Sequence, residues 1–182
     1  MINVVLLVGV VVLLLAILSY NRLVQLRNQV RTSWADIDVQ LRRRHDLVPQ
    51  LVAAVKAYAG HERGVLEAVT ELRSKAVAET SPARLGAVES SLELALAQLF
   101  ALKEAYPDLK ANGNFLQLQR DLVEVEDQLQ YARRFYNGAV RDFNTAIQRF
   151  PGVLIARTGG FNESEFFSAP DDERSAVPVV LS

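Results

Sequence analysis

The chain has 182 residues, no cysteine and a formal net charge of −1 at pH 7, from 20 basic and 21 acidic residues. This balance argues against a protein that binds nucleic acid or depends on polybasic lipid binding, so no nucleic-acid partner is expected. The absence of cysteine removes disulfide and thiolate chemistry from consideration and suits either side of a membrane.

The first element is an apolar run from Ile2 to Leu18 that only Asn3 interrupts. Val4–Leu18 has no polar side chain, and Met1–Ser19 reaches the roughly 17 residues that form the lower limit for crossing a bilayer. A cleaved signal peptide would need a charged start and small residues before the cut, and neither is present. We therefore expect an uncleaved transmembrane anchor at residues 1–19, with its apolar core from Val4 to Leu18 and the lipid bilayer as a partner.

The charges beside the anchor indicate its orientation. Arg22, Arg27 and Arg31 follow it before the first acid, Asp36, whereas only the terminal amine precedes it. Positive charge accumulates on the cytoplasmic side of membrane spans. We expect a single-pass protein with its amino terminus outside and its body in the cytoplasm.

Beyond the anchor, the sequence predicts helices only. No proline or glycine lies between Tyr20 and Pro49, so the anchor is expected to run into the body as one helix, with a kink near Val48. Apolar residues then recur in steps of three and four, which is typical of long helices packed in a left-handed bundle or coiled coil. The four stripes are Leu23, Leu26, Val30, Trp34, Ile37, Leu41, Leu47 or Val48, Leu51, Val55 and Tyr58; Val65, Val69, Leu72 and Ala76; Leu85, Val88, Leu92, Ala95, Leu99, Leu102 and Tyr106; and Phe115, Leu118, Leu122, Val125, Leu129, Ala132, Tyr136, Ala139, Phe143, Ala146 and Phe150.

The ends of these helices have recognisable signals. Ser81 followed by Pro82 is suited to begin the third helix, and Asn114 with Gln117 resembles a capping box for the fourth. Phe150-Pro151-Gly152 is expected to end that helix.

The predicted fold is all-α: an anchor that continues into an antiparallel up-and-down four-helix bundle over residues 20–152. A three-helix bundle remains the alternative if the first two helices join through Gly60. Residues 153–182 are expected to form an irregular, partly mobile tail, although Phe161, Phe166 and Phe167 could dock on the bundle.

The residues that could carry catalysis are few. The chain has two histidines, His45 and His61, and His61-Glu62 lacks the second histidine of a zinc-protease motif because position 65 is Val65. In the cluster Arg42–Asp46, charges four residues apart can pair on one helix face, so we interpret the cluster as a solvated surface. We expect no active site, no cofactor, no metal and no small-molecule substrate.

A contact surface is the better hypothesis for the polar and aromatic residues on the first helix and near the membrane. Buried asparagines that set helix register are the alternative explanation for part of this group. The candidate interface comprises Trp34, Asp36, Asp38, Arg43, Arg44, His45, Tyr20, Asn21, Tyr136 and Asn137.

Long blocks of the sequence resemble the LemA family. They are Tyr20-Asn21-Arg22-Leu23-Val24, residues 34–41 (WADIDVQL), residues 43–49 (RRHDLVP), residues 106–112 (YPDLKAN), residues 115–119 (FLQLQ), residues 132–137 (ARRFYN) and Phe150-Pro151-Gly152. The resemblance implies a bacterial, membrane-anchored, antiparallel helical bundle, and a magnetosome-membrane protein is a member of the same family. It implies no reaction, because the molecular function of the family is poorly defined.

The expected function is a non-enzymatic, membrane-anchored scaffold or adaptor of the bacterial inner membrane. It would act through self-assembly into a homo-oligomer or through binding of other membrane proteins. The alternative is a signalling module that transmits a shift through the continuous first helix.

Overall fold

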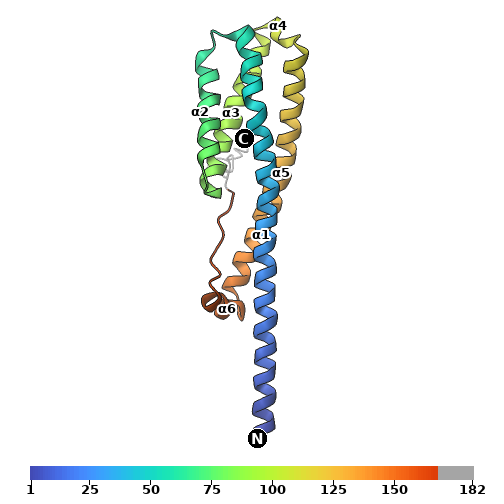
Figure 1. Cartoon of the computed structure of the whole chain (residues 1–182), viewed down its shortest axis with the longest axis vertical. Coiled ribbons are helices and arrows are strands. Elements are labelled where there is room, and N and C mark those ends of the chain that lie inside the picture. Colours follow the sequence, from blue (N-terminus) through green and yellow to red (C-terminus); the bar gives the residue numbers. More distant parts are fainter. Residues whose placement is uncertain (168–182) are drawn as a thin grey trace, which may run out of the picture. The chain divides into compact units, whose positions relative to one another are not determined.

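The computed structural model describes residues 1–167, and this part of the chain contains helices and no β-strand (Figure 1). The elements are α1 (Ile2–Ala59), α2 (Arg63–Ala78), α3 (Pro82–Ala101), the 3₁₀ turn η1 (Leu102–Glu104), α4 (Pro107–Lys110), α5 (Gly113–Gln148) and α6 (Gly152–Gly159). The predicted all-α class, with an apolar amino-terminal helix that continues into a helical body, is confirmed.

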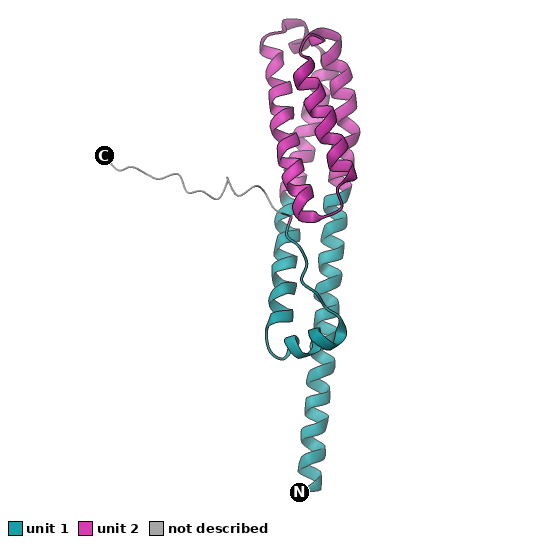
Figure 2. Cartoon of the chain, turned by 90° about the vertical axis from the view of Figure 1, so that its left-hand side faces the viewer, with its two compact units in different colours: residues 1–38, 131–166 teal, residues 39–130, 167–182 magenta. Residues whose placement is uncertain are grey.

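The chain divides into two compact units, which are coloured separately in Figure 2. Unit 1 contains Met1–Asp38 and Tyr131–Phe166, and unit 2 contains Val39–Gln130 together with Phe167. Both α1 and α5 contribute residues to each unit.

Unit 2 is a four-helix bundle made of the end of α1, α2, α3 and the beginning of α5 (Figure 2). The predicted stripes supply its core, and Leu51, Leu92, Leu99 and Leu129 are completely buried. Each such side chain contributes about 1.5–3 kcal/mol through burial. The three-helix alternative is wrong, because a turn after Ala59 separates α1 from α2.

The helix starts in unit 2 confirm one predicted cap and correct another. Ser81 Oγ accepts a hydrogen bond from the Arg84 N–H at 3.4 Å, with Pro82 as the first residue of α3. For α5 the cap is Asn112, whose Oδ1 accepts from the Phe115 N–H at 2.9 Å. The prediction of Asn114 was wrong by two positions, because α5 already begins at Gly113.

Unit 1 is built on residues 2–38 of α1 and the last part of α5 (Figure 2). α6 follows, and Gly160, with φ of 67°, ends it in the left-handed conformation that glycine adopts readily. The expectation of an irregular chain from residue 153 is therefore wrong for the residues of α6.

Residues 161–166 also pack in unit 1. Phe161 is buried, with its ring 5.6 Å from that of Tyr20 and 6.4 Å from that of Phe143, in edge-on contacts. Asn144 makes two 2.9 Å hydrogen bonds with Ser164, giving one from its amide and accepting one from the backbone N–H. The expected docking is found for Phe161, whereas Phe166 is 42% exposed. Residues 168–182 lie outside the described part.

The apolar end of α1 is exposed along its length. Its most apolar 18-residue window has a mean hydropathy of 3.0 and is 0% buried, whereas the comparable window of α3 has a value of 1.4 and is 39% buried as a core helix. Exposure of an apolar surface of this size to water is unfavourable, whereas the hydrocarbon core of a bilayer accommodates it.

Truncation of a core leucine tests the register of the bundle. Leu129→Ala should destabilise the protein by about 2–5 kcal/mol, because it leaves a cavity in a fully buried position. Leu94→Ala is the matched control: this leucine is 69% exposed, and its truncation should change stability by less than about 0.5 kcal/mol. Chemical denaturation in mild detergent measures both values, and equal stabilities would show that the register is wrong.

Candidate functional site

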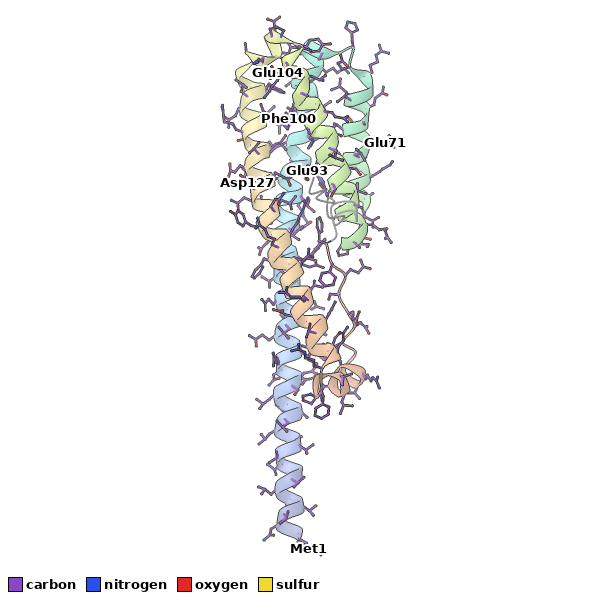
Figure 3. All side chains as sticks on the ribbon, turned by 180° about the vertical axis from the view of Figure 1, so that it is seen from behind. Met1, Glu71, Glu93, Phe100, Glu104 and Asp127 are labelled. Atoms are coloured by element: carbon purple, nitrogen blue, oxygen red, sulfur yellow. The ribbon has the colours of Figure 1, made fainter. Side chains whose placement is uncertain are left out.

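The most concentrated group of charges in unit 2 lies inside the bundle. Glu89 of α3 is completely buried, and its Oε1 lies 2.6 Å from His45 Nε2 of α1. Its Oε2 lies 3.3 Å from Arg44 Nη1, which also reaches Glu126 Oε2 of α5 at 3.1 Å. We call these four residues the buried ionic cluster. Other acids of the body, such as Glu71, Glu104 and Asp127, are exposed (Figure 3).

The interpretation of Arg42–Asp46 as a solvated face is wrong for Arg44 and His45. Both are buried, at 2% and 8% exposure, so neither presents a surface to a partner. The reason is helical geometry: the steps of three and four that bury Ile37 and Leu41 place position 44 on the same stripe. Arg42, Arg43 and Asp46 are exposed, as expected, and Arg43 forms an ion pair with Glu124 at 3.5 Å.

The sequence contained a signal that could have identified this cluster. The predicted stripe passes from Leu41 directly to Leu47 or Val48, although a step of three from Leu41 reaches Arg44. A charge at a core position requires a partner of opposite charge, and Glu89 lies beside Val88 on the stripe of α3.

Pro49 creates a second polar contact at the same level of α1. It lacks an N–H, so the carbonyl of His45, four residues earlier, has no donor within the helix. Arg73 of α2 supplies that donor: its Nε lies 2.7 Å from the His45 carbonyl oxygen. A side chain from the neighbouring helix thus satisfies the backbone group that the proline leaves open.

The aromatic candidates Trp34, Tyr136 and Tyr20 all lie in unit 1. Tyr136 is buried against the half-buried Trp34, with ring centroids 5.2 Å apart, and its hydroxyl donates to the Glu165 carbonyl at 2.8 Å. Burial, with a smaller effect of the Glu165 carboxylate, raises the pKa of Tyr136 to about 12, so it stays neutral at physiological pH.

The candidate Tyr20 does not lie beside Tyr136. Tyr20 contacts Phe161 instead, because it precedes Trp34, the partner of Tyr136, by about four turns of α1, or roughly 20 Å. Of the other candidates, Asn21 and Asp36 are exposed, and Asp38 and Asn137 are half-buried.

An exposed aromatic pair that the sequence reasoning missed lies on α5 in unit 1. Tyr131 and Phe135 are 65% and 56% exposed and sit one turn apart on one face. The Arg134 guanidinium lies 5.1 Å from the centre of the Tyr131 ring. Two aromatics four positions apart, outside an otherwise regular apolar stripe, are the signal that could have identified the pair.

The described residues offer no constellation for metal chemistry. Within residues 1–167, no group of three or more histidine, aspartate or glutamate side chains could hold a metal ion. The buried ionic cluster contains the acids and the histidine best placed for proton transfer, but they are engaged with one another in the core.

Sequence comparisons decide the family. The model of the LemA family matches residues 33–181. The chain belongs to the LemA family. It is similar to Protein LemA of Metamycoplasma hominis, with 29% identity over 161 residues, which cover 86% of this chain and 72% of that protein.

Magnetosome proteins are also similar to this LemA-family chain. MamQ of Magnetospirillum gryphiswaldense is 23% identical over 177 residues, and MamQ 2 of Paramagnetospirillum magneticum is 23% identical over 180 residues. Each alignment covers 83% of this chain and 65% of the relative, so the chain spans slightly less than two thirds of these magnetosome proteins. Together with the exposed apolar helix, the family makes this a membrane-associated helical protein.

Removal of the central cation tests the buried ionic cluster. Arg44→Ala should cost about 3–5 kcal/mol, because it leaves Glu89 buried without its guanidinium partner. Arg43→Ala, which removes the exposed neighbouring arginine, should change stability by about 1 kcal/mol or less. Denaturant unfolding distinguishes them, and a small effect of Arg44→Ala would show that position 44 is solvated.

A double-mutant cycle tests the pairing of Arg73 with the carbonyl that Pro49 leaves open. Arg73→Ala should cost about 1.5–3 kcal/mol in the wild-type chain, since a hydrogen bond from a charged donor is lost at a backbone acceptor. With Pro49→Ala the backbone donor returns, so the same arginine substitution should cost less. Equal costs in both backgrounds would show that Arg73 does not compensate for the N–H that Pro49 lacks.

Proposed function

We propose that this protein is a non-enzymatic, membrane-anchored scaffold or adaptor that works through contacts of its helical body. The apolar part of α1 is the proposed single-pass anchor in the bacterial inner membrane, with the body in the cytoplasm. The arginines after the anchor support that orientation.

The observation that carries the proposal is the exposed Tyr131–Phe135 pair. Soluble proteins rarely leave adjacent aromatics uncovered, and tyrosine and arginine are among the residues that dominate interface energies. Arg134 lies against the Tyr131 ring, so the patch combines apolar area with a positive charge. These features suit a protein contact better than a substrate site.

Self-assembly is the leading form of this proposal. Anchoring confines copies to two dimensions and raises their effective concentration, so a patch of modest size suffices for association. Binding of another membrane protein through the same patch is the other form. The Asp36, Asp38 and Asn137 side chains remain candidates for its periphery, because they are exposed or half-buried.

A signalling module is the second candidate function. One observation favours it: α1 is a single helix from Ile2 to Ala59, and Pro49 does not end it. A stimulus at the apolar end could move such a helix as a unit. This function would require an input at the membrane and a separate effector, whereas a scaffold requires neither.

The absence of native cysteine allows a specific crosslinking test in native membranes. Asp127→Cys introduces one exposed thiol a turn before Tyr131, and oxidation should yield a disulfide-linked dimer of the full chain. Adding Tyr131→Ser and Phe135→Ser should abolish most of this dimer, at a cost of about 2 kcal/mol or more in association free energy.

Matched controls keep this result interpretable. Val77→Ser with Leu94→Ser removes two other exposed apolar side chains and should leave the dimer intact. A thiol at the exposed position of Glu71 should not crosslink. A dimer that survives loss of both aromatics would exclude the patch as the contact surface. Crosslinking to a different protein, with no dimer, would replace self-assembly by partner binding.

A further inference from the structure

Unit 1 contains a cavity of about 600 Å³ just beyond the apolar part of α1. It lies between α1, the end of α5 and the start of α6. Ser19, Arg22, Arg141, Thr145, Arg149 and Phe150 are among the residues that line it, together with Asp142. Cavities of this size accommodate small organic ligands.

The charge of the cavity is positive. Three arginines line it, and the one acid among the lining residues is Asp142. Asp142 lies 3.7 Å from its neighbour Arg141, and both side chains are mostly exposed, so this contact neutralises little. Within residues 1–167, Arg22 and Arg149 form no ion pair. The cavity therefore has guanidinium groups available for an anion.

With Val4–Leu18 as the membrane span proposed above, on which this inference rests, the cavity falls at the depth of the headgroup layer. Arg22 comes one helical turn after Leu18, or about 6 Å along α1. A second, mainly apolar cavity of about 430 Å³ lies between α1 and α6 and is lined by Ala16, Ile17 and Ile155 among others. α6 thus lies beside the last apolar turn of the anchor.

Uncovered apolar side chains lie at the charged cavity and on the adjoining first turn of α6. Phe150, which lines it, is 79% exposed, and Leu154 on the first turn of α6 is 55% exposed. Apolar side chains next to arginines are characteristic of segments that lie in the membrane interface.

We propose that this cavity binds the phosphate of an anionic phospholipid headgroup. Arg22, Arg141 and Arg149 would donate to the phosphate oxygens, because the planar guanidinium matches phosphate with two parallel hydrogen bonds. The Ser19 and Thr145 hydroxyls supply further donors. The depth and the apolar rim favour a lipid over a soluble phosphate, since Phe150 and Leu154 can enter the acyl boundary while the arginines hold the headgroup.

Lipid retention by the full chain tests this site. The protein is placed in nanodiscs of phosphatidylcholine with phosphatidylglycerol, and native mass spectrometry measures which lipid stays bound. The wild type should retain phosphatidylglycerol selectively. Arg22→Gln, Arg141→Gln and Arg149→Gln together should reduce that selectivity by about ten-fold or more, since each arginine contributes to anionic-lipid attraction.

A matched triple variant separates the cavity from net charge. Arg31→Gln, Arg63→Gln and Arg120→Gln remove the same charge from exposed positions outside the cavity and should leave selectivity within about two-fold of the wild type. If the cavity variant melts early, Arg22→Gln and Arg149→Gln are tested singly, and each should still lower retention.

Two results would overturn the proposal. Equal losses in both triple variants would mean that binding depends on total charge. Displacement of the lipid by millimolar glycerol phosphate, with equal binding of glycerol phosphate in lipid-free detergent, would make the ligand a soluble phosphate. Retention that resists glycerol phosphate and depends on the three cavity arginines supports the lipid assignment.

Discussion

A buried carboxylate imposes the strictest constraint on the bundle. Glu89 is completely inside, and an unpaired charge there would cost several kcal/mol. Both of its oxygens are engaged, one by His45 and the other by Arg44, and Arg44 also reaches Glu126. A core of leucines packs almost as well after a shift along the helices, but this carboxylate finds its partners in one register only. The cluster therefore sets the alignment of α1, α3 and α5 in unit 2, while apolar burial supplies most of the stability.

The same turn of α1 also determines where α2 packs. Pro49 deprives the His45 carbonyl of its helical donor, and Arg73 of α2 takes that role. His45 thus contacts α3 through its ring and α2 through its backbone. The side chain of one residue and the carbonyl of the same residue connect three helices, so Pro49 is tolerated inside a 58-residue helix because tertiary structure compensates for it.

Periodicity made much of this fold predictable from the sequence. The apolar steps located the four long helices and most of their core, because helical geometry alone decides which positions share a face. The caps were less predictable: Asn112 and Asn114 are equally good capping residues, and their order along the chain does not decide between them. The burial of Arg44 and His45 and the docking of Phe161 depend on partners far along the chain, Glu89 and Tyr20. Local patterns do not contain that information, so the charges of Arg42–Asp46 resemble a solvated face and residues 153–182 resemble an irregular tail.

The distribution of polar and apolar groups along α1 bears directly on function. At its beginning, apolar side chains face outward, as a bilayer requires, whereas farther along, charged groups are buried and engaged with one another. The residues of the buried ionic cluster, which have the best chemistry for proton transfer, thus stabilise the fold. Replacing them would alter folding before it altered any reaction. The groups outside the core are of a different kind: an aromatic pair on α5 and an arginine-lined cavity beside the apolar part of α1. Surfaces of this composition recognise other molecules by contact and charge, so the physical chemistry of the exposed residues favours binding over catalysis.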